Sequence, residues 1–187
     1  MRRLRRIVVV CGYGCDLNSE LKMYLDRVLQ YCYANRPDAV ILCGGATQRR
    51  RFPHETEASV MQKYLGSLEG YCHPRWYILG GSYTAYENIR DAAAVIGPLK
   101  RTLQPDDIQI TIFCEVTRSL KVAILARHFM GFPPKDGLPP IRIETDSWEK
   151  GHPTKQLFGA IKEVLAISFP FINSVRSAKV RLKSRMR

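Results

Sequence analysis

The order of apolar segments along the chain constrains its fold more than any other sequence feature. Short apolar runs rich in β-branched residues occur at residues 7–12, 39–45, 76–81, 108–114 and, in a more exposed form, 139–145. Segments with helical spacing of apolar residues follow at residues 18–36, 53–65, 84–103, 117–130 and 155–168. This alternation predicts a single-domain, three-layer α/β fold with a mainly parallel five-stranded sheet and helices on both faces.

Basic residues are concentrated at the two ends of the chain. The 187 residues carry a net charge of +12, with four arginines in residues 1–6 and six basic residues in residues 176–187. We therefore expect a basic N-terminal tip at residues 1–6, the α/β domain at 7–173 and a basic C-terminal tail at 174–187. Such tips are usually solvated; the alternative is a weak contact with an anionic membrane or with nucleic acid.

The cysteines and the apolar runs bear on where the protein resides. The six cysteines match no zinc spacing and include no CxxC pair, which indicates reduced thiols. No secretory signal and no transmembrane segment is expected, because every apolar run is too short. A cytoplasmic location follows, with a peripheral position at the inner face of the membrane as the alternative. No metal site is expected either, since His54, Glu55 and Glu57 would point in different directions on a helix.

Glycines end several of the predicted strands. In an open parallel sheet, ligands bind outside the carboxyl ends of the strands, so these strand ends should meet at one edge. Gly12 and Gly14 form an isolated G-x-G, and Gly44 and Gly45 lack the Lys-Ser/Thr of a P-loop. They serve either tight turns or the close approach of a ligand to the backbone, and the sequence leaves both explanations open.

Polar residues at helix starts are the next candidates. Glu57 lies where the helix dipole favours a carboxylate in any case. Thr84 and Glu87 form a capping box. Asn88, in the first turn of the same helix, offers an amide that can fix a ribose, a phosphate or a carboxylate.

The strongest single candidate is Glu115, which ends the fourth strand and has no expected capping role. A carboxylate there suits acid/base chemistry or the binding of a ribose. Thr117 opens the following helix, whose N-terminus can bind an anion, and Arg118 would strengthen that binding.

Five short motifs in order resemble the YdcF-like family, which includes SanA and ElyC and is a domain of unknown function. The motifs are Val10-Cys-Gly12, Leu25-Asp-Arg27, Leu42-Cys-Gly44-Gly45, Glu57-Ala58 and Tyr86-Glu87-Asn88. The resemblance covers residues 7–130 and implies a Rossmann-like fold with a small-molecule site at the sheet edge. One member of the family is associated with S-adenosylmethionine and others with the bacterial envelope. This chain departs from the pattern in having Ala85 in a threonine position and no histidine after the fourth strand.

Three functional hypotheses result. In the first, the protein binds, and as a transferase or hydrolase transforms, a nucleotide-type or phosphate-bearing small molecule, for which S-adenosylmethionine is one candidate. Glu57, Glu87 and Glu115 would then be acid/base candidates; the ligand-binding candidates are Gly12, Gly14, Gly44, Gly45, Thr84, Asn88, Thr117 and Arg118. The second is a non-catalytic binding or regulatory module, which the missing histidine favours. The third is a peripheral protein tethered to a membrane by its apolar last helix and basic tail.

Overall fold

The predicted sheet is confirmed. The computed structural model describes residues 4–66, 74–102, 107–131, 141–146 and 153–186. Within it, five parallel strands lie in the order β3-β2-β1-β4-β5. Their bounds are β1 Arg5–Cys11, β2 Ala39–Cys43, β3 Arg75–Leu79, β4 Ile108–Glu115 and β5 Ile141–Asp146. The result is a single-domain, three-layer Rossmann-like α/β fold.

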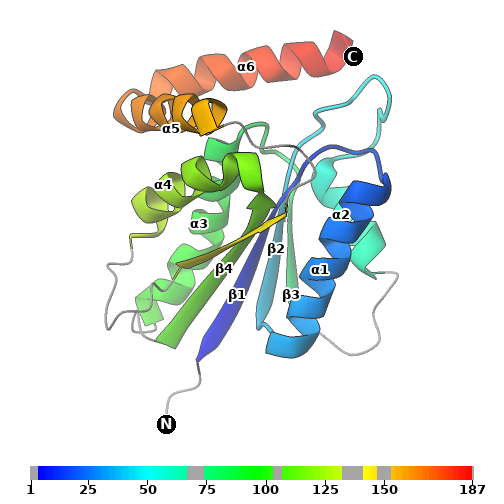
Figure 1. Cartoon of the computed structure of the whole chain (residues 1–187), viewed down its shortest axis with the longest axis vertical. Coiled ribbons are helices and arrows are strands. Elements are labelled where there is room, and N and C mark those ends of the chain that lie inside the picture. Colours follow the sequence, from blue (N-terminus) through cyan, green and yellow to red (C-terminus); the bar gives the residue numbers. More distant parts are fainter. Residues whose placement is uncertain (1–3, 67–73, 103–106, 132–140, 147–152, 187) are drawn as a thin grey trace.

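Helices cover both faces of the sheet (Figure 1). On one face lie α1 (Ser19–Asn35) and α2 (Glu57–Gly66), and on the other lie α3 (Ala85–Thr102) and α4 (Ser119–Met130). The chain builds outward from β1 to β3, then crosses back to place β4 on the other side of β1. The carboxyl ends of β1 and β4 therefore form the topological switch point, where ligands of such folds bind.

Alternating residues of the central strands divide the core in two. Val8 and Val10 of β1 pack toward α1 and α2, whereas Ile7 and Val9 pack toward α3 and α4. Because both sets are buried, the strand has no polar face. This explains why residues 7–11 of the strand are continuously apolar in the sequence.

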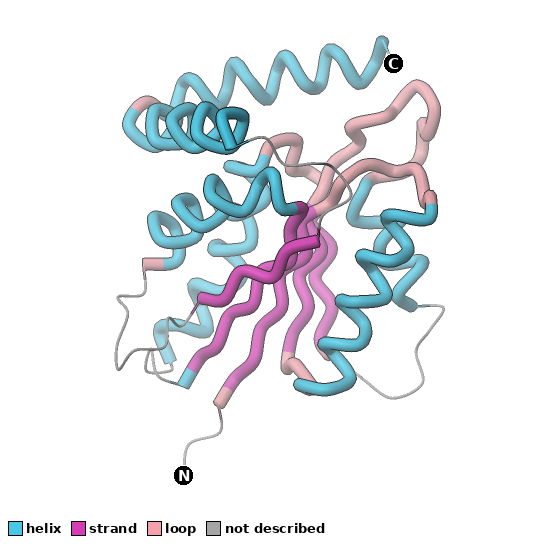
Figure 2. The backbone as a smooth tube through the Cα atoms, in the orientation of Figure 1, coloured by secondary structure: helices cyan, strands magenta, loops and turns pink. Residues whose placement is uncertain are grey.

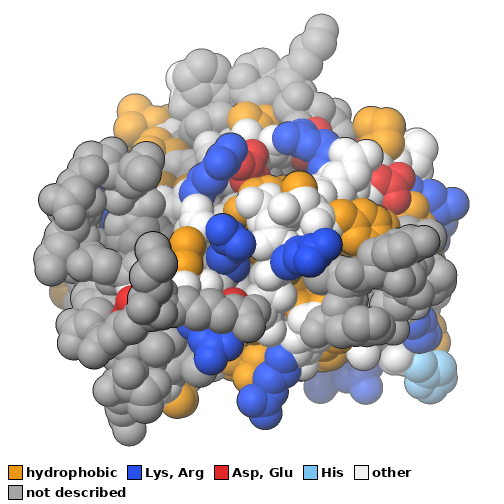
Figure 3. Space-filling model, turned by 90° about the horizontal axis from the view of Figure 1, so that it is seen from below, with side chains coloured by type: hydrophobic (Ala, Val, Ile, Leu, Met, Phe, Trp, Pro, Cys, Tyr) orange, Lys and Arg blue, Asp and Glu red, His pale blue; other side chains and the backbone are white. Residues whose placement is uncertain are grey.

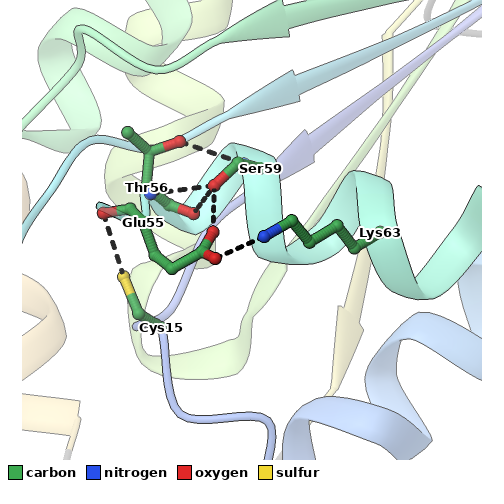
Figure 4. A network of polar contacts seen from close by, with 5 residues as sticks. All are labelled: Cys15, Glu55, Thr56, Ser59 and Lys63. Atoms are coloured by element: carbon green, nitrogen blue, oxygen red, sulfur yellow. Dashed lines mark hydrogen bonds and ion pairs between the residues drawn. The ribbon is translucent and has the colours of Figure 1, made fainter. Parts of the chain in front are cut away.

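The start of α2 differs from the prediction. The sequence favoured Pro53 as the first helical residue, but residues 47–54 form turns and α2 begins at Glu57. Thr56 and Ser59 cap this helix reciprocally, with Ser59 N donating to Thr56 Oγ1 at 3.0 Å and Thr56 N donating to Ser59 Oγ at 2.9 Å (Figure 4). These two hydrogen bonds satisfy backbone amides at the start of α2, and a helix that began at Pro53 would need its cap at another position.

Both predicted basic ends are more ordered than expected. Arg5 and Arg6 belong to β1, where Asp38 accepts hydrogen bonds from the Arg5 side chain and the Arg6 amide. After α5 (Pro153–Ser168), the expected solvated tail instead forms a further helix, α6 (Pro170–Met186). Figures 1 and 2 show α6 lying across the carboxyl end of the sheet. The tail expected at residues 174–187 is therefore helical over residues 174–186, while its basic side chains Lys179, Arg181, Lys183 and Arg185 are exposed.

Other features complete the description. Among the described residues, Cys11, Cys15, Cys32, Cys43 and Cys114 are buried and form no disulfide bond. Cys72 lies outside the described residues. Within the described part of the chain, no single helix is long and apolar enough to cross a membrane, although Leu157–Ser168 and Phe171–Met186, bent by 119°, pass that test as a pair.

Candidate functional site

The candidate site lies at the carboxyl ends of β1 and β4. Burial raises the pKa of the Cys11 thiol at the end of β1 to about 12, and the charges of Arg118, Glu57 and Lys121 act on the same thiol. These three charged groups therefore lie near the carboxyl end of β1, at the topological switch of the sheet. They come from η2 (Val116–Arg118), α2 and α4 respectively.

Glu57 is a buried carboxyl group held in one orientation. Its Oε1 accepts hydrogen bonds from Gly14 N at 2.9 Å and from Thr47 Oγ1 at 2.6 Å. Burial raises the pKa of Glu57, while the Thr47 hydrogen bond, the charge of Arg118 and the Gly14 hydrogen bond oppose that rise. A carboxyl group with increased proton affinity is suited to acid/base work near neutral pH.

The protein itself fills the space beside the predicted glycines. A Cβ on Gly12 or on Gly44 would lie 2.5 Å from Glu57 Oε2, and one on Gly45 would lie 2.8 Å from the Ser82 carbonyl oxygen. Gly14 has φ +109°, a backbone conformation that residues other than glycine rarely adopt. Of the two explanations for these glycines, internal packing and backbone conformation account for all four in this structure.

Glu115 has a capping role that the sequence analysis did not expect. Its Oε2 accepts hydrogen bonds from the Thr117 amide at 2.9 Å and from the Thr117 hydroxyl, which caps η2. The prediction that Glu115 has no capping role is therefore wrong. Thr117, a predicted ligand-binding residue, donates its amide and hydroxyl hydrogens to Glu115. The other oxygen, Oε1, is buried and has no hydrogen-bond partner among the described residues.

That unpaired oxygen is the most informative atom of the site. Glu115 is only 2% exposed, so solvent reaches it poorly. Leaving a buried polar atom without a partner costs about 1–3 kcal/mol, more for a charged group. Buried polar atoms of native proteins are nearly always paired, so Oε1 needs a donor, such as a water or a ligand.

Two cationic groups flank the N-terminal end of α4. Arg118 Nη1 donates to the Gly12 carbonyl oxygen at 3.1 Å, and its guanidinium lies 4.5 Å from the centre of the Tyr13 ring. Burial lowers the pKa of Lys121, the positive charge of Arg118 lowers it further, and Glu163 opposes both. Two cations near a helix N-terminus form an environment that favours an anion.

Thr84 and Glu87 have structural partners instead. Thr84 Oγ1 accepts from Glu87 N at 3.1 Å and donates to Asn173 Oδ1 of α6 at 3.0 Å. Glu87 Oε2 accepts from Tyr83 N at 2.7 Å, so the capping box reaches one residue further back than predicted. Asn88 is buried, and its Oδ1 has no hydrogen-bond partner within the described part of the chain. It retains a free acceptor.

The structure thus brings some of the predicted residues together by direct contact. Glu57 contacts Gly14 and approaches Gly12 and Gly44, and Arg118 binds Gly12. Thr84 and Glu87 form a separate group that fixes the start of α3 and one end of α6. The Oδ1 atom of Asn88 binds to neither group in the described structure.

Sequence reasoning missed several partners. Thr47 and Gln48 follow β2 and hold Glu57 and the Cys15 amide respectively. Their only sequence signal is their place directly after the paired glycines. Arg176 and Glu163 form a bidentate ion pair between α6 and α5, with oxygen–nitrogen distances of 2.7 and 3.1 Å; Glu163 is buried and Arg176 is partly exposed. Their separation of 13 residues gave no reason to pair them.

Arg50 and Arg51, in the loop after β2, and Glu55 at the start of α2 have structural partners. Arg51 forms an ion pair with Asp16 at 2.8 Å, and Arg50 Nη1 donates to the Met186 carbonyl oxygen of α6 at 3.1 Å. Figure 4 shows Glu55 facing Ser59 and Lys63 at the start of α2. The hydrogen bond from Lys63, with one from Ser59, lowers the pKa of Glu55.

The described residues contain no group of three or more His, Cys, Asp or Glu side chains that could hold a metal ion.

Comparison with known proteins adds no assignment: no protein-family model matches the chain, and neither does any curated protein or solved structure. The site must therefore be interpreted from its own chemistry.

Proposed function

We propose that this protein binds a nucleotide-type or phosphate-bearing small molecule at the carboxyl edge of its sheet, and that a buried carboxyl group there serves as acid or base in a transfer or hydrolysis. The observation that carries the proposal is the unpaired, buried Oε1 of Glu115 at the end of β4. It offers a hydrogen-bond acceptor at the position where such folds bind ligands.

The chemistry of the surrounding groups supports this ligand class. An acceptor on Glu115 suits a ligand hydroxyl or amine, and the cations Arg118 and Lys121 suit a phosphate or carboxylate. A nucleotide combines ribose hydroxyls with phosphate, and S-adenosylmethionine combines ribose hydroxyls with a carboxylate. Both ligands therefore match the same two parts of the site: the acceptor on Glu115 and the cations Arg118 and Lys121.

The two carboxyl groups have different expected roles. Glu57 has a raised pKa, which suits the transfer of a proton, but its Oε1 is already held by two donors. Glu115 keeps one oxygen for the ligand. We therefore assign ligand binding to Glu115 and the acid/base step to Glu57.

A non-catalytic binding module is the second candidate. It is favoured by the segment Val116–Lys121, which contains two basic residues but no histidine to act in chemistry. Both candidates share the ligand site and differ only in turnover.

The test is a thermal-shift screen with S-adenosylmethionine, adenine nucleotides and sugar phosphates, because a ligand that prefers the folded state raises the melting temperature. Glu115→Gln is the key variant, since its amide oxygen can still cap η2 while its NH₂ replaces the free acceptor with a donor. We expect about tenfold weaker binding, one hydrogen bond's worth. Glu20→Gln, on an exposed face of α1, is the matched control and should bind as wild type does.

The outcomes separate the candidates. Unchanged affinity in Glu115→Gln would remove Glu115 from the site, and a screen without any stabilising ligand would count against the whole proposal. Turnover that Glu57→Gln abolishes while binding persists supports the enzyme. Binding without turnover in the wild-type protein supports the module.

A further inference from the structure

Helix α6 is built with its polarity inverted relative to an ordinary surface helix. Its buried residues are all polar: Asn173, Ser177 and Ser184. Four of its large apolar residues are exposed, among them Phe171 at 66%, Val175 at 65% and Leu182 at 60%, while Ile172 and Val180 are half-buried. A helix that merely covered the sheet would turn these faces the other way.

The outward residues form one stripe. Phe171, Val175, Leu182 and Met186 are spaced by four, seven and four residues, so at about 100° per residue they share one side of the helix. The buried Asn173, Ser177 and Ser184 lie on the opposite side by the same arithmetic.

Basic residues border this stripe on both sides. On the same helical projection, Lys179 and Lys183 lie along one side of the stripe and Arg181 and Arg185 along the other. Residues 170–187 contain six basic residues and no acidic residue. The pattern of apolar stripe and cationic borders is that of a helix lying in the interface of an anionic membrane.

Helix α5 extends the apolar surface. Among its described residues, Leu157, Phe158, Ile161, Val164 and Leu165 are exposed. The exposed Phe169 and Phe171 bring their rings to 6.2 Å at the junction of the two helices. Ten of the thirteen large apolar residues exposed in the described chain lie between residues 157 and 186. A patch of this kind marks an interaction surface.

We infer that α6, with the exposed apolar residues of α5, docks the protein on an anionic lipid bilayer, with α6 lying along the membrane surface. Charge complementarity selects this occupant. A second copy of the chain docked on this surface would bring two rows of cations together, whereas anionic lipid headgroups would neutralise them.

The docked orientation would turn the ligand edge toward the membrane. The inner face of α6 binds the loops that follow β2 and β3: Ser184 O accepts from Arg50 N at 3.3 Å, and Asn173 Oδ1 accepts from Thr84 Oγ1. The carboxyl edge of the sheet therefore lies directly under α6. Basic side chains are also spread over the opposite end of the molecule, seen from below in Figure 3, so charge alone does not mark this surface.

The experiment is flotation of the full chain with vesicles of phosphatidylcholine, with and without phosphatidylglycerol. The main variant is Val175→Ser with Leu182→Ser, which removes apolar side chains that are largely exposed and so leaves the fold intact. Met23→Ser on α1, where Met23 is 60% exposed, is the matched control. We expect wild type and the control to float with the phosphatidylglycerol vesicles, and the double variant to partition at least about tenfold less.

Two further measurements complete the test. Lys179→Gln with Lys183→Gln should weaken partitioning roughly fivefold for each charge lost, and the loss should be largest at low salt. Leu182→Trp should shift its fluorescence to shorter wavelength on binding, whereas Met23→Trp should not.

Three results would overturn the inference. The first is partitioning that depends on the lysines but is unchanged in Val175→Ser with Leu182→Ser, which would indicate electrostatic attraction only. The second is a wild-type dimer that this variant dissociates, without vesicle binding, which would make the stripe an interface between copies. The third is a fluorescence spectrum of the Leu182→Trp variant that stays unchanged on vesicles that nevertheless bind the protein.

Discussion

Gly12→Ala tests whether the glycines at the strand ends exist to admit Glu57. A Cβ at this position would lie 2.5 Å from Glu57 Oε2, 2.7 Å from Glu57 Cβ and 2.9 Å from the Cys43 carbonyl oxygen. All three distances are below 3.0 Å, so Glu57 and the adjacent backbone must move. Overpacking of this kind costs about 1–3 kcal/mol.

The movement has a second cost. Displacing Glu57 weakens the hydrogen bonds that its Oε1 accepts from Gly14 and Thr47, each worth about 1 kcal/mol. We therefore expect Gly12→Ala to lower the free energy of unfolding by about 3 kcal/mol. For a chain of this length that corresponds to a melting temperature roughly 6–12 °C lower.

The assay is urea unfolding of a double-mutant cycle. Glu57→Gly removes two of the three clashing atoms and leaves only the Cys43 oxygen, so Gly12→Ala should cost about 1 kcal/mol in that background, a coupling of about 2 kcal/mol. Gly81→Ala is the control, because its Cβ would meet no described atom within 4 Å. Equal costs of Gly12→Ala with and without Glu57 would refute the reasoning and restore ligand approach as the purpose of Gly12.

Three further predictions concern stability. Asn18→Ala should cost about 1 kcal/mol in urea unfolding, because Asn18 Oδ1 accepts from Leu21 N at 2.9 Å and caps α1. Arg176→Met should cost about 3 kcal/mol by leaving the carboxylate of Glu163 buried and unpaired, and adding Glu163→Gln should recover most of it; an equal loss in the double variant would contradict this. The raised pKa of Glu57 makes the folded state bind its proton more tightly, so wild type should lose stability relative to Glu57→Gln as pH rises from the ordinary carboxyl range to that raised pKa; parallel pH profiles would contradict this.

The sheet could be predicted because strands buried on both faces carry an unambiguous pattern. In β1 and β2, every residue that packs into one of the two cores is apolar. A helix of that length that packs on one face only would not be apolar all round. The start of α2 could not be predicted, because Pro53 is acceptable at a first helical position. Only the hydrogen bonds between Thr56 and Ser59 decide where the helix begins.

Helix α6 escaped prediction for a related reason. A search for helices looks for an apolar stripe that faces a core, and the stripe of α6 faces outward while Asn173, Ser177 and Ser184 face the protein. Together with six basic residues, this pattern matched a solvated tail.

The position of the candidate residues in the fold was predictable, but their partners were not. The rule for strand ends predicted that Glu115 and Arg118 lie at the carboxyl edge of the sheet, and the structure places them there. The partners of Glu57, however, lie 10 and 43 residues away at Thr47 and Gly14, and contacts of that range depend on the folded loops. The capping role of Glu115 was hidden because a cap on a three-residue 3₁₀ helix has no distinct sequence signature.

We predict that anion binding at the proposed site depends on pH through Lys121. Burial and the charge of Arg118 lower its pKa in the ligand-free protein, and Arg176 contributes in the same direction. A bound anion would stabilise the protonated amine and raise that pKa again, so binding takes up a proton in the interval between the two values. Affinity for sulfate, a probe that does not titrate in this range, should therefore fall as pH rises above the lowered pKa of Lys121. Lys121→Arg keeps the positive charge at every accessible pH, so its affinity should stay flat over the same interval. Calorimetric titration from neutral to alkaline pH measures both profiles, and a decline of equal slope in wild type and Lys121→Arg would exclude Lys121 from the anion subsite.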